Sequence, residues 1–301
     1  MANGLVIFAT EENFDEEAYL LHNGDVAAAV KMGRFSSGRE HFEKHRHETR
    51  IIGYDASYYD CKFGLTSKLP PPGLVALVNG HTDLVAFANS RRPAADIIVE
   101  FLTAVEEPLH RFKSILDFGC GCGRIVAGFE GLLPQGTKIS GCDVNPKLLN
   151  FSRDAVSFAE FVVNDQTPPL PFPDGQFDLV YCSSVFTHMS QSGLEAWASE
   201  LRRIVMPNGV VLVTHHGTKY AGVLEQLSSF GSRILAEQGF YVHWHEQRAD
   251  EDGSNDIATF ASSDFMLRLF KGFDLIRIFP GVTYGPNAFC ADQDTIIFRR
   301  R

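Results

Sequence analysis

Two segments in the middle of the chain have the residue types and the spacing of a ligand-binding turn. The segment FGCGCGR places Gly119, Gly121 and Gly123 at alternate positions, directly after the apolar run SILD. Glycines at such a strand-to-helix turn let a ligand approach the backbone closely. Asp143 lies 20 residues after Gly123, roughly the distance at which an acidic residue receives a ribose hydroxyl. The pattern predicts a ribose-binding site, with a structural corner and a helix cap as the alternatives for the glycines and Asp143.

Two histidines lie where a general base could act. His188, in VFTHM, follows the fourth expected strand, and His216, in VTHHG, ends the fifth. A neutral imidazole at the carboxyl end of such a strand can take the proton that a hydroxyl group releases. We favour His216, because a residue that closes a strand is held more rigidly than one in a loop. Packing or helix capping is the alternative for both, and His215 should point to the opposite face.

The cysteines and the other histidines suggest packing and not metal binding. Cys120 and Cys122 form C-x-C, and no second pair lies at zinc spacing. Small thiols fit where glycines leave little room, so we expect neither metal nor redox chemistry there. His41 and His45 have a spacing that can bind metal on a helix, but no carboxylate follows at a defined spacing. We expect a solvated, charged face there.

The elements that must position these residues alternate between strands and helices. We expect strands at 114–119, 138–144, 160–165, 177–184 and 209–216, and helices at 94–105, 123–133, 145–156 and 193–206. This alternation predicts a parallel sheet covered on both faces. Two closing strands, 273–281 and 294–301, have no helix between them and should pair antiparallel. The expected fold class is α/β: a Rossmann-like, seven-stranded, mostly parallel sheet with an antiparallel last strand and helices on both faces.

Charge and hydropathy exclude some classes of protein. The formal net charge is -10, and no Lys/Arg run of the kind that nucleic-acid binders carry is present. We therefore expect no nucleic-acid partner. No stretch approaches roughly 18 uninterrupted apolar residues, so no membrane span is predicted. The first residues lack a basic start and a long apolar run, which argues against a signal peptide and, with cysteines that fit reduced thiols, predicts a cytoplasmic location.

Four motifs make residues 92–301 resemble the class I S-adenosylmethionine-dependent methyltransferases. The segments ILDFGCGCGR and GCDVNP are similar to the first and second motifs of that family. The run LPFPDGQFDLVYCSSVFTHM is similar to the family's path into and past the fourth strand. LRRIVMPNGVVLVT is similar to the turn before the fifth strand, with Met206 and Asn208 in place of the usual Lys and Gly.

The resemblance implies S-adenosylmethionine as the cofactor and a set of residues that hold it. The implied residues come from the ends of the first four strands: Asp117, Gly119, Cys120, Gly121, Asp143, Asn145, Asn164, Asp165, Gln166 and Ser183. The glycine turn would pass under the methionine and ribose, and Asp143 would hold the ribose. Either Asn164 or Asp165 would reach the adenine amine. Ser183 would lie beside the methionine part.

The resemblance also implies two parts of the chain with different roles. Residues 1–91, which we expect to be irregular as far as about 75, would form an N-terminal extension that caps the substrate side. Residues 92–301 would form the methyltransferase domain, in which 217–270 would be a lid inserted before the sixth strand. Within that insertion, FYVHWHE (240–246) should be a strand or lid segment that packs on the core.

The expected function is O-methylation of a small molecule, such as a saccharide or natural product. Residues 69–92 are similar to the front end of a group of bacterial methyltransferases, and some related enzymes modify sugars or glycans. N- or C-methylation of a small metabolite is the alternative within the class. A nicotinamide-dependent oxidoreductase and a non-catalytic cofactor-binding subunit are the alternatives outside it. A homodimer stays open.

Overall fold

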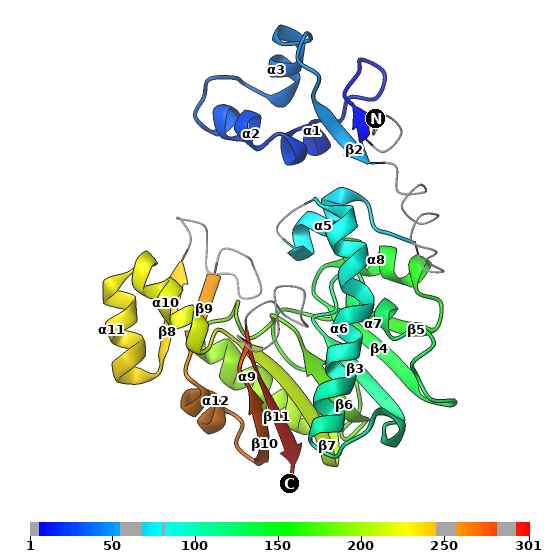
Figure 1. The fold of residues 1–301 in the computed structure, drawn as a ribbon, viewed down its shortest axis with the longest axis vertical. Coiled ribbons are helices and arrows are strands. Elements are labelled where there is room, and N and C mark those ends of the chain that lie inside the picture. The colour runs from blue at the N-terminus through cyan, green and yellow to red at the C-terminus, as the bar shows by residue number, and fades with distance from the viewer. Residues whose placement is uncertain (1–5, 55–67, 80–81, 245–256, 282–292) are drawn as a thin grey trace. The chain divides into compact units, whose positions relative to one another are not determined.

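The computed structural model describes residues 6–54, 68–79, 82–244, 257–281 and 293–301 (Figure 1). The chain divides into two compact units, Met1–Asn89 and Ser90–Arg301. In the described part of the chain, no helix has both the length and the hydropathy that crossing a membrane requires.

The second unit is built on a seven-stranded sheet in the order β10-β11-β7-β6-β3-β4-β5. Only β11 runs antiparallel to its neighbours β7 and β10, and the remaining pairs are parallel (Figure 1). The predicted α/β fold class is therefore confirmed. The strands are β3 (Ser114–Phe118), β4 (Lys138–Asp143), β5 (Ala159–Val163), β6 (Phe177–Cys182), β7 (Val205–His215), β10 (Phe273–Phe279) and β11 (Asp294–Arg300).

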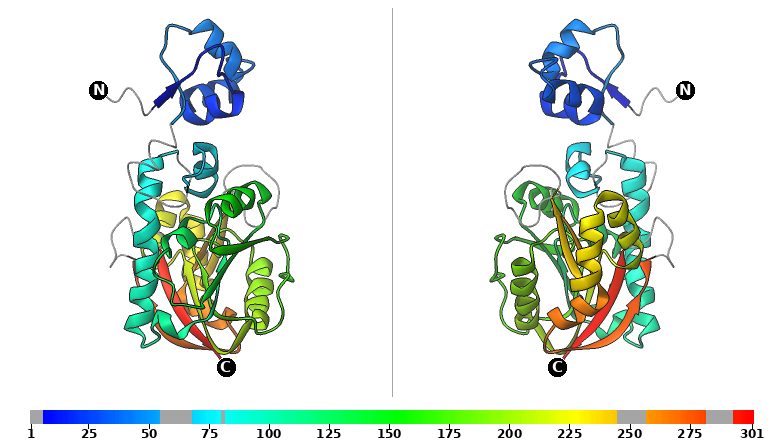
Figure 2. Two further views of the ribbon diagram at one scale, coloured as in Figure 1. Left: turned by 90° about the vertical axis from the view of Figure 1, so that its right-hand side faces the viewer. Right: turned by 90° about the vertical axis from the view of Figure 1, so that its left-hand side faces the viewer.

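Helices cover both faces of this sheet, as the two views of Figure 2 show. On one face, α6 (Leu84–Ala104), α7 (Arg124–Gly128) and α8 (Pro146–Ala155) pack on side chains such as Leu179 and Tyr181 of β6. On the other face, α9 (Gln191–Ile204) and α12 (Ser263–Leu269) pack on Val180 and Cys182. Successive strand residues point to opposite faces, so a continuous apolar run such as β6 is buried on both.

Two helices differ in length from the sequence prediction. The first begins at Leu84 and not at 94, because the Asp83 carboxylate accepts the Val85 and Ala86 N–H groups and caps its N-terminus. The helix after the glycine turn ends at Gly128 and not at 133. Gly131, with φ +72°, takes a left-handed conformation that a helix cannot include.

Five elements lie between β7 and β10, in the segment that we call the insertion. It contains α10 (Thr218–Leu227), α11 (Ser229–Gln238), β8 (Phe240–Trp244), β9 (Ile257–Ala261) and α12. The strands β8 and β9 form a separate antiparallel pair. The predicted strand at 240–246 is confirmed as far as Trp244, and its last two residues lie outside the described part of the chain.

The first unit is not irregular, so that prediction is wrong for its described residues. It contains β1 (Val6–Phe8), α1 (Glu16–His22), α2 (Gly24–Lys31), α3 (Gly38–Lys44), β2 (Ile51–Tyr54) and α5 (Pro72–Asn79). Phe14, Tyr19 and Phe42 form its aromatic core. These helices are too short for a long periodic pattern of apolar residues, and side-chain caps stabilise their ends. The Glu16 carboxylate, for example, accepts the N–H groups of Gly38 and Arg39 at the start of α3.

The predicted solvated face at His41 and His45 is also wrong for His41. Its side chain is only 6% exposed, and its Nδ1 lies 3.1 Å from the Tyr19 hydroxyl. Its ring stacks on that of His45, with 4.6 Å between the centroids. The polar contact with Tyr19 offsets the free-energy cost of burying this imidazole.

Candidate active site

The glycine turn between β3 and α7 has the backbone that its sequence predicts. Gly119, Gly121 and Gly123 all have positive φ, at +77°, +56° and +72°. A Cβ on Gly119 would lie 2.3 Å from Cγ2 of Val185, in the loop after β6. The N–H groups of Gly119 and Cys120 both donate to the carbonyl oxygen of Cys142 at the neighbouring strand, at 2.8 and 3.0 Å. Gly119 is therefore required by the packing of two loops as well as by its φ.

The carboxylate of Asp143 joins this turn to the end of β4. Its Oδ2 accepts the Gly121 N–H and its Oδ1 accepts the Asn145 N–H, both at 2.9 Å. The side-chain cap of α8 is Asn145, which accepts the Lys147 N–H. Each carboxylate oxygen keeps a second lone pair, and Asp143 is only half-buried. Burial raises its pKa, against the backbone donors that lower it. The carboxylate is thus held in place with acceptor capacity left for hydroxyl donors.

Asn164 extends the same edge of the sheet beyond β5. Its backbone N–H donates to the carbonyl oxygen of Asp143 at 3.1 Å, and its side-chain amide donates to that of Asp165 at 2.7 Å. Its Oδ1 is buried and has no hydrogen-bond partner among the described residues. Such an acceptor fits an amine donor of a ligand. Asp165 and Gln166 are exposed beside it.

A hydrogen-bond network that the sequence did not predict links the ends of β6, β7 and β11. Ser183 is half-buried, and Ser184 takes a left-handed φ of +59°. The Ser184 N–H donates to Oγ1 of Thr214 at 2.8 Å, and that hydroxyl donates to Oε1 of Gln293 at 2.7 Å. The Gln293 amide donates back to Oγ of Ser184 at 2.9 Å. No local pattern indicates this triangle, because its members are 30 to 109 residues apart.

Three histidine rings are held along one edge of β9. Nδ1 of His188 lies 2.8 Å from the carbonyl oxygen of Ile257. Nδ1 of His216 lies 3.0 Å from that of Thr259, and Nδ1 of His215 lies 2.9 Å from that of Ala261. A carbonyl oxygen only accepts, so each Nδ1 carries the proton in these bonds. Each neutral ring therefore has its lone pair on Nε2. The strand β9 selects the tautomer of both candidate bases.

The two candidate bases differ in their surroundings. His216 lies one residue beyond β7, where it forms an isolated bridge to Phe260. Its ring stacks on Tyr220 at 4.2 Å, and its side chain is 9% exposed. Burial lowers the pKa of His216 to about 3, and the nearby His188 acts in the same direction. His188 itself is only half-buried. It is therefore the more accessible of the two imidazoles.

Asp117 and the cysteines of the turn are buried beneath it. Asp117 is 1% exposed, and burial raises its pKa to about 8, against the effects of Tyr181 and Arg124. Cys120 and Cys122 are 5% and 1% exposed, and burial raises the pKa of Cys122 to about 12. Their thiols therefore stay protonated at neutral pH, which makes them poor nucleophiles.

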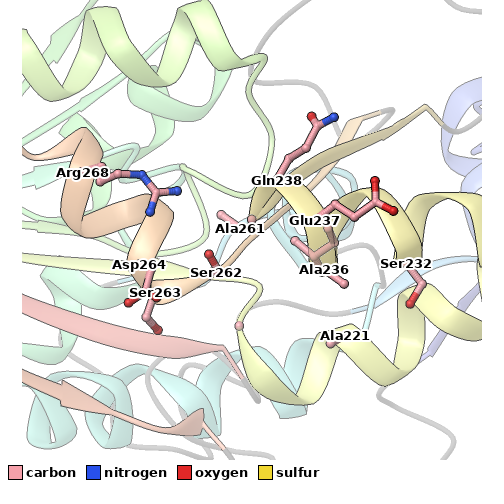
Figure 3. Close-up of a pocket in the computed structure, with 13 residues that line it drawn as sticks. Ala221, Ser232, Ala236, Glu237, Gln238, Ala261, Ser262, Ser263, Asp264 and Arg268 are labelled. Atoms are coloured by element: carbon pink, nitrogen blue, oxygen red, sulfur yellow. The ribbon is translucent and has the colours of Figure 1, made fainter.

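The insertion encloses a pocket of about 520 Å³ (Figure 3). It begins at Gly217, the residue after His216, and lies between α10, α11 and the segment from the end of β9 to α12. Ser232 and Glu237 come from α11, and Asp264 and Arg268 come from α12. Its volume is within the range of small-molecule sites, and both signs of charge line it.

Comparison with known proteins identifies the central segment. The model of the methyltransferase domain family matches residues 115–209. An uncharacterised methyltransferase of Schizosaccharomyces pombe is 32% identical over 107 residues, which are 32% of this chain and 37% of that protein. The 2-methyl-6-phytyl-1,4-hydroquinone methyltransferase of Synechocystis is 31% identical over 105 residues, which are 33% of this chain and 31% of that protein. The matches thus cover less than half of the length of these relatives.

Solved structures of similar fold include the glycopeptide N-methyltransferase MtfA complexed with S-adenosyl-L-methionine. Its TM-score is 0.46 at 14% identity, over 69% of this chain and 92% of that chain. A methyltransferase of Methanosarcina mazei has a TM-score of 0.47 at 19% identity, over 62% and 92% of the two chains. The domain match over residues 115–209 and the seven-stranded sheet support a class I S-adenosylmethionine-dependent methyltransferase.

Proposed function

We propose that this protein methylates a hydroxyl group of a small molecule, such as a saccharide or natural product. The observation that supports this best is the pair of imidazoles bonded to β9: their Nδ1–H groups donate to its carbonyl oxygens, so Nε2 is the basic nitrogen of each neutral ring. They belong to the same end of the sheet as the glycine turn, at which α/β folds bind their ligands. A hydroxyl acceptor must release its proton as it is methylated, so a positioned base is useful there.

The residues at the strand ends fit S-adenosylmethionine. Asp143 offers lone pairs to the ribose hydroxyls, and the partnerless Oδ1 of Asn164 offers an acceptor to the adenine amine. The backbone of Gly121 and the residues around Ser183 would lie beside the ribose and methionine parts. When bound, the cofactor supplies a methyl group on a positively charged sulfur, which makes that methyl group electrophilic.

We assign the base to His188 in preference to His216. Burial makes His216 a weak base, with a pKa of about 3, and its ring is stacked on Tyr220. His188 is half-buried, and its Nδ1–H is fixed by the carbonyl oxygen of Ile257. In this proposal Nε2 of His188 takes the proton of the acceptor hydroxyl. His216 then supports β9 and the wall of the site.

We further propose that the insertion helps to choose the acceptor. Its pocket of about 520 Å³ is lined within residues 217–268 and offers Arg268, Asp264 and Glu237 as polar groups. These groups are suited to hydroxyl-rich ligands. Four further points remain predictions from the sequence. They are the N-terminal extension as a cap on the substrate side, the absence of a nucleic-acid partner, the cytoplasmic location and a homodimer.

The test combines binding with product analysis. Calorimetry should show S-adenosylhomocysteine binding and no NAD binding. A cell extract incubated with the protein and cofactor carrying a labelled methyl group should yield a labelled small molecule, and mass spectrometry of its fragments should place the label on oxygen. Label on nitrogen or carbon would refute the hydroxyl acceptor. Binding of NAD without S-adenosylhomocysteine would refute the whole assignment.

A further inference from the structure

A compact group of metal-ligating side chains lies in the first unit, separate from the methyltransferase chemistry. His45, His47 and Glu48 follow directly after α3. The turn is closed by the Glu48 N–H, which donates to the carbonyl oxygen of His45 at 2.8 Å. One ring nitrogen of each histidine and one carboxylate oxygen all lie within 4.8 Å of one another. Oε1 of Glu48 is already 3.3 Å from Nδ1 of His45.

The donor types match a particular class of cation. Two imidazoles with one carboxylate form a ligand set that zinc uses, with a fourth position left for water or another ligand. Nitrogen donors disfavour magnesium and calcium, which prefer oxygen. Zinc ligands at about 2.1 Å stand about 3.4 Å apart in a tetrahedron, so the widest separation in the group must shorten by at most about 1.4 Å. The exposed His47 can supply this movement by rotating its side chain.

Neighbouring residues hold two of the three ligands in place. Arg50 donates to Oε2 of Glu48 at 2.5 Å and also pairs with Asp25, so the carboxylate keeps Oε1 on the histidine side. The ring of His45 stacks on His41. Such partners of the ligands fix their orientation in metal sites.

His41 packs beside this group and is not one of the metal-ligating residues. Its Nδ1 is engaged with the Tyr19 hydroxyl, and its side chain is buried. The neighbouring cations have their own partners: Lys44 pairs with Glu40, and Arg46 pairs with Glu11. The site also follows the C-terminus of α3, where the helix dipole favours positive charge.

We propose that His45, His47 and Glu48 bind one divalent transition-metal ion of the zinc type. The site belongs to the first unit alone, so it does not depend on the proposed methyltransferase function. An ion pair between Glu48 and a protonated His45 is the competing explanation for the same geometry. That explanation predicts no gain from a metal.

The experiment is calorimetric titration of ZnCl₂ into the full chain, free of affinity tags and first treated with a chelator. The proposal expects one Zn²⁺ per chain, and a loss of affinity of at least about 10- to 100-fold in His47→Gln and in Glu48→Gln. His110→Gln, at an exposed histidine elsewhere, and His216→Gln are the matched controls and should bind as the native protein does. Circular dichroism should show that all four variants fold.

Each other outcome overturns the proposal. Equal zinc affinity in His47→Gln and the native protein would place the metal elsewhere. Loss of affinity in His216→Gln alone would place it beside the histidines on β9. Absence of zinc binding would leave the ion pair of His45 and Glu48 as the explanation. Magnesium chloride titrated in place of zinc should give no binding, and equal affinity for both ions would refute a site with imidazole ligands.

Discussion

Replacing Asp143 by asparagine tests the proposed cofactor site most directly. The carboxylate of Asp143 accepts one N–H group on each oxygen, from Gly121 and from Asn145. Asparagine keeps one acceptor oxygen but presents an NH₂ donor to the other N–H group. The variant therefore loses the negative charge and at least one charge-assisted hydrogen bond within the protein. It also loses an acceptor for the ribose.

The expected effects follow from these contacts. A hydrogen bond to a charged group contributes about 1.5–3 kcal/mol, so the free energy of unfolding should fall by about that amount. At about 2–4 °C per kcal/mol, the melting temperature should fall by about 3–12 °C. Loss of one ribose contact of the same kind should weaken S-adenosylhomocysteine binding by about 10- to 100-fold.

The assay pairs calorimetry of S-adenosylhomocysteine with thermal unfolding, and the chain offers a matched control. Asp178, at the start of β6, likewise accepts two backbone N–H groups, from Lys113 and Ser114, at 2.7 and 2.9 Å. It lies at the opposite end of the sheet from Asp143, because β6, β3 and β4 are parallel. Asp178→Asn should therefore lose similar stability and keep its ligand affinity.

The comparison of the two variants decides the question. If Asp143→Asn unfolds earlier but binds S-adenosylhomocysteine as tightly as the native protein, Asp143 serves only to join the glycine turn to β4. If both variants lose affinity equally, the loss reflects general destabilisation of the sheet. Either result would refute the ribose assignment.

Three further predictions concern the base, the buried acid and the thiols. His188→Ala should lower turnover by at least about 100-fold and leave S-adenosylhomocysteine affinity unchanged. His216→Ala should lower turnover less, because the pKa of His216 is about 3. The reverse order of the two effects would assign the base to His216. The pKa of Asp117 is about 8 in the folded protein and 3.8 ordinarily, so between these pH values the folded protein keeps a proton that the unfolded chain releases. The free energy of unfolding therefore falls as the pH rises from 3.8 to 8, by up to about 1.4 kcal/mol per pH unit. Asp117→Asn should thus gain melting temperature over the native protein from pH 5 to pH 8, and a constant difference would contradict the raised pKa. Joint replacement of Cys120 and Cys122 by alanine should leave metal content and most cofactor affinity unchanged, and elemental analysis that finds a bound metal lost would contradict their packing role.

Local patterns in the sequence determined the sheet and the turn at which we propose the cofactor site. Strands buried on both faces read as short apolar runs, and the alternating glycines of 119–123 mark left-handed backbone, because both properties depend on the residue itself and its neighbours. For the same reason Asp143 could be assigned to the end of the second strand of the domain. The first unit gave no such signal, since its short helices rely on caps and on an aromatic core assembled from separate segments.

Only the tertiary structure decided the chemistry of the histidines. His188 and His216 obtain their tautomers from carbonyl oxygens 69 and 43 residues away, on a strand of the insertion. The low pKa of His216 and the raised pKa of Asp117 come from burial, which depends on how the whole unit packs. The pairing of His45 with Glu48 depends on a turn held by Arg50 and Asp25. Side-chain type and spacing are written in the sequence, whereas desolvation and long-range hydrogen bonds exist only once distant segments meet.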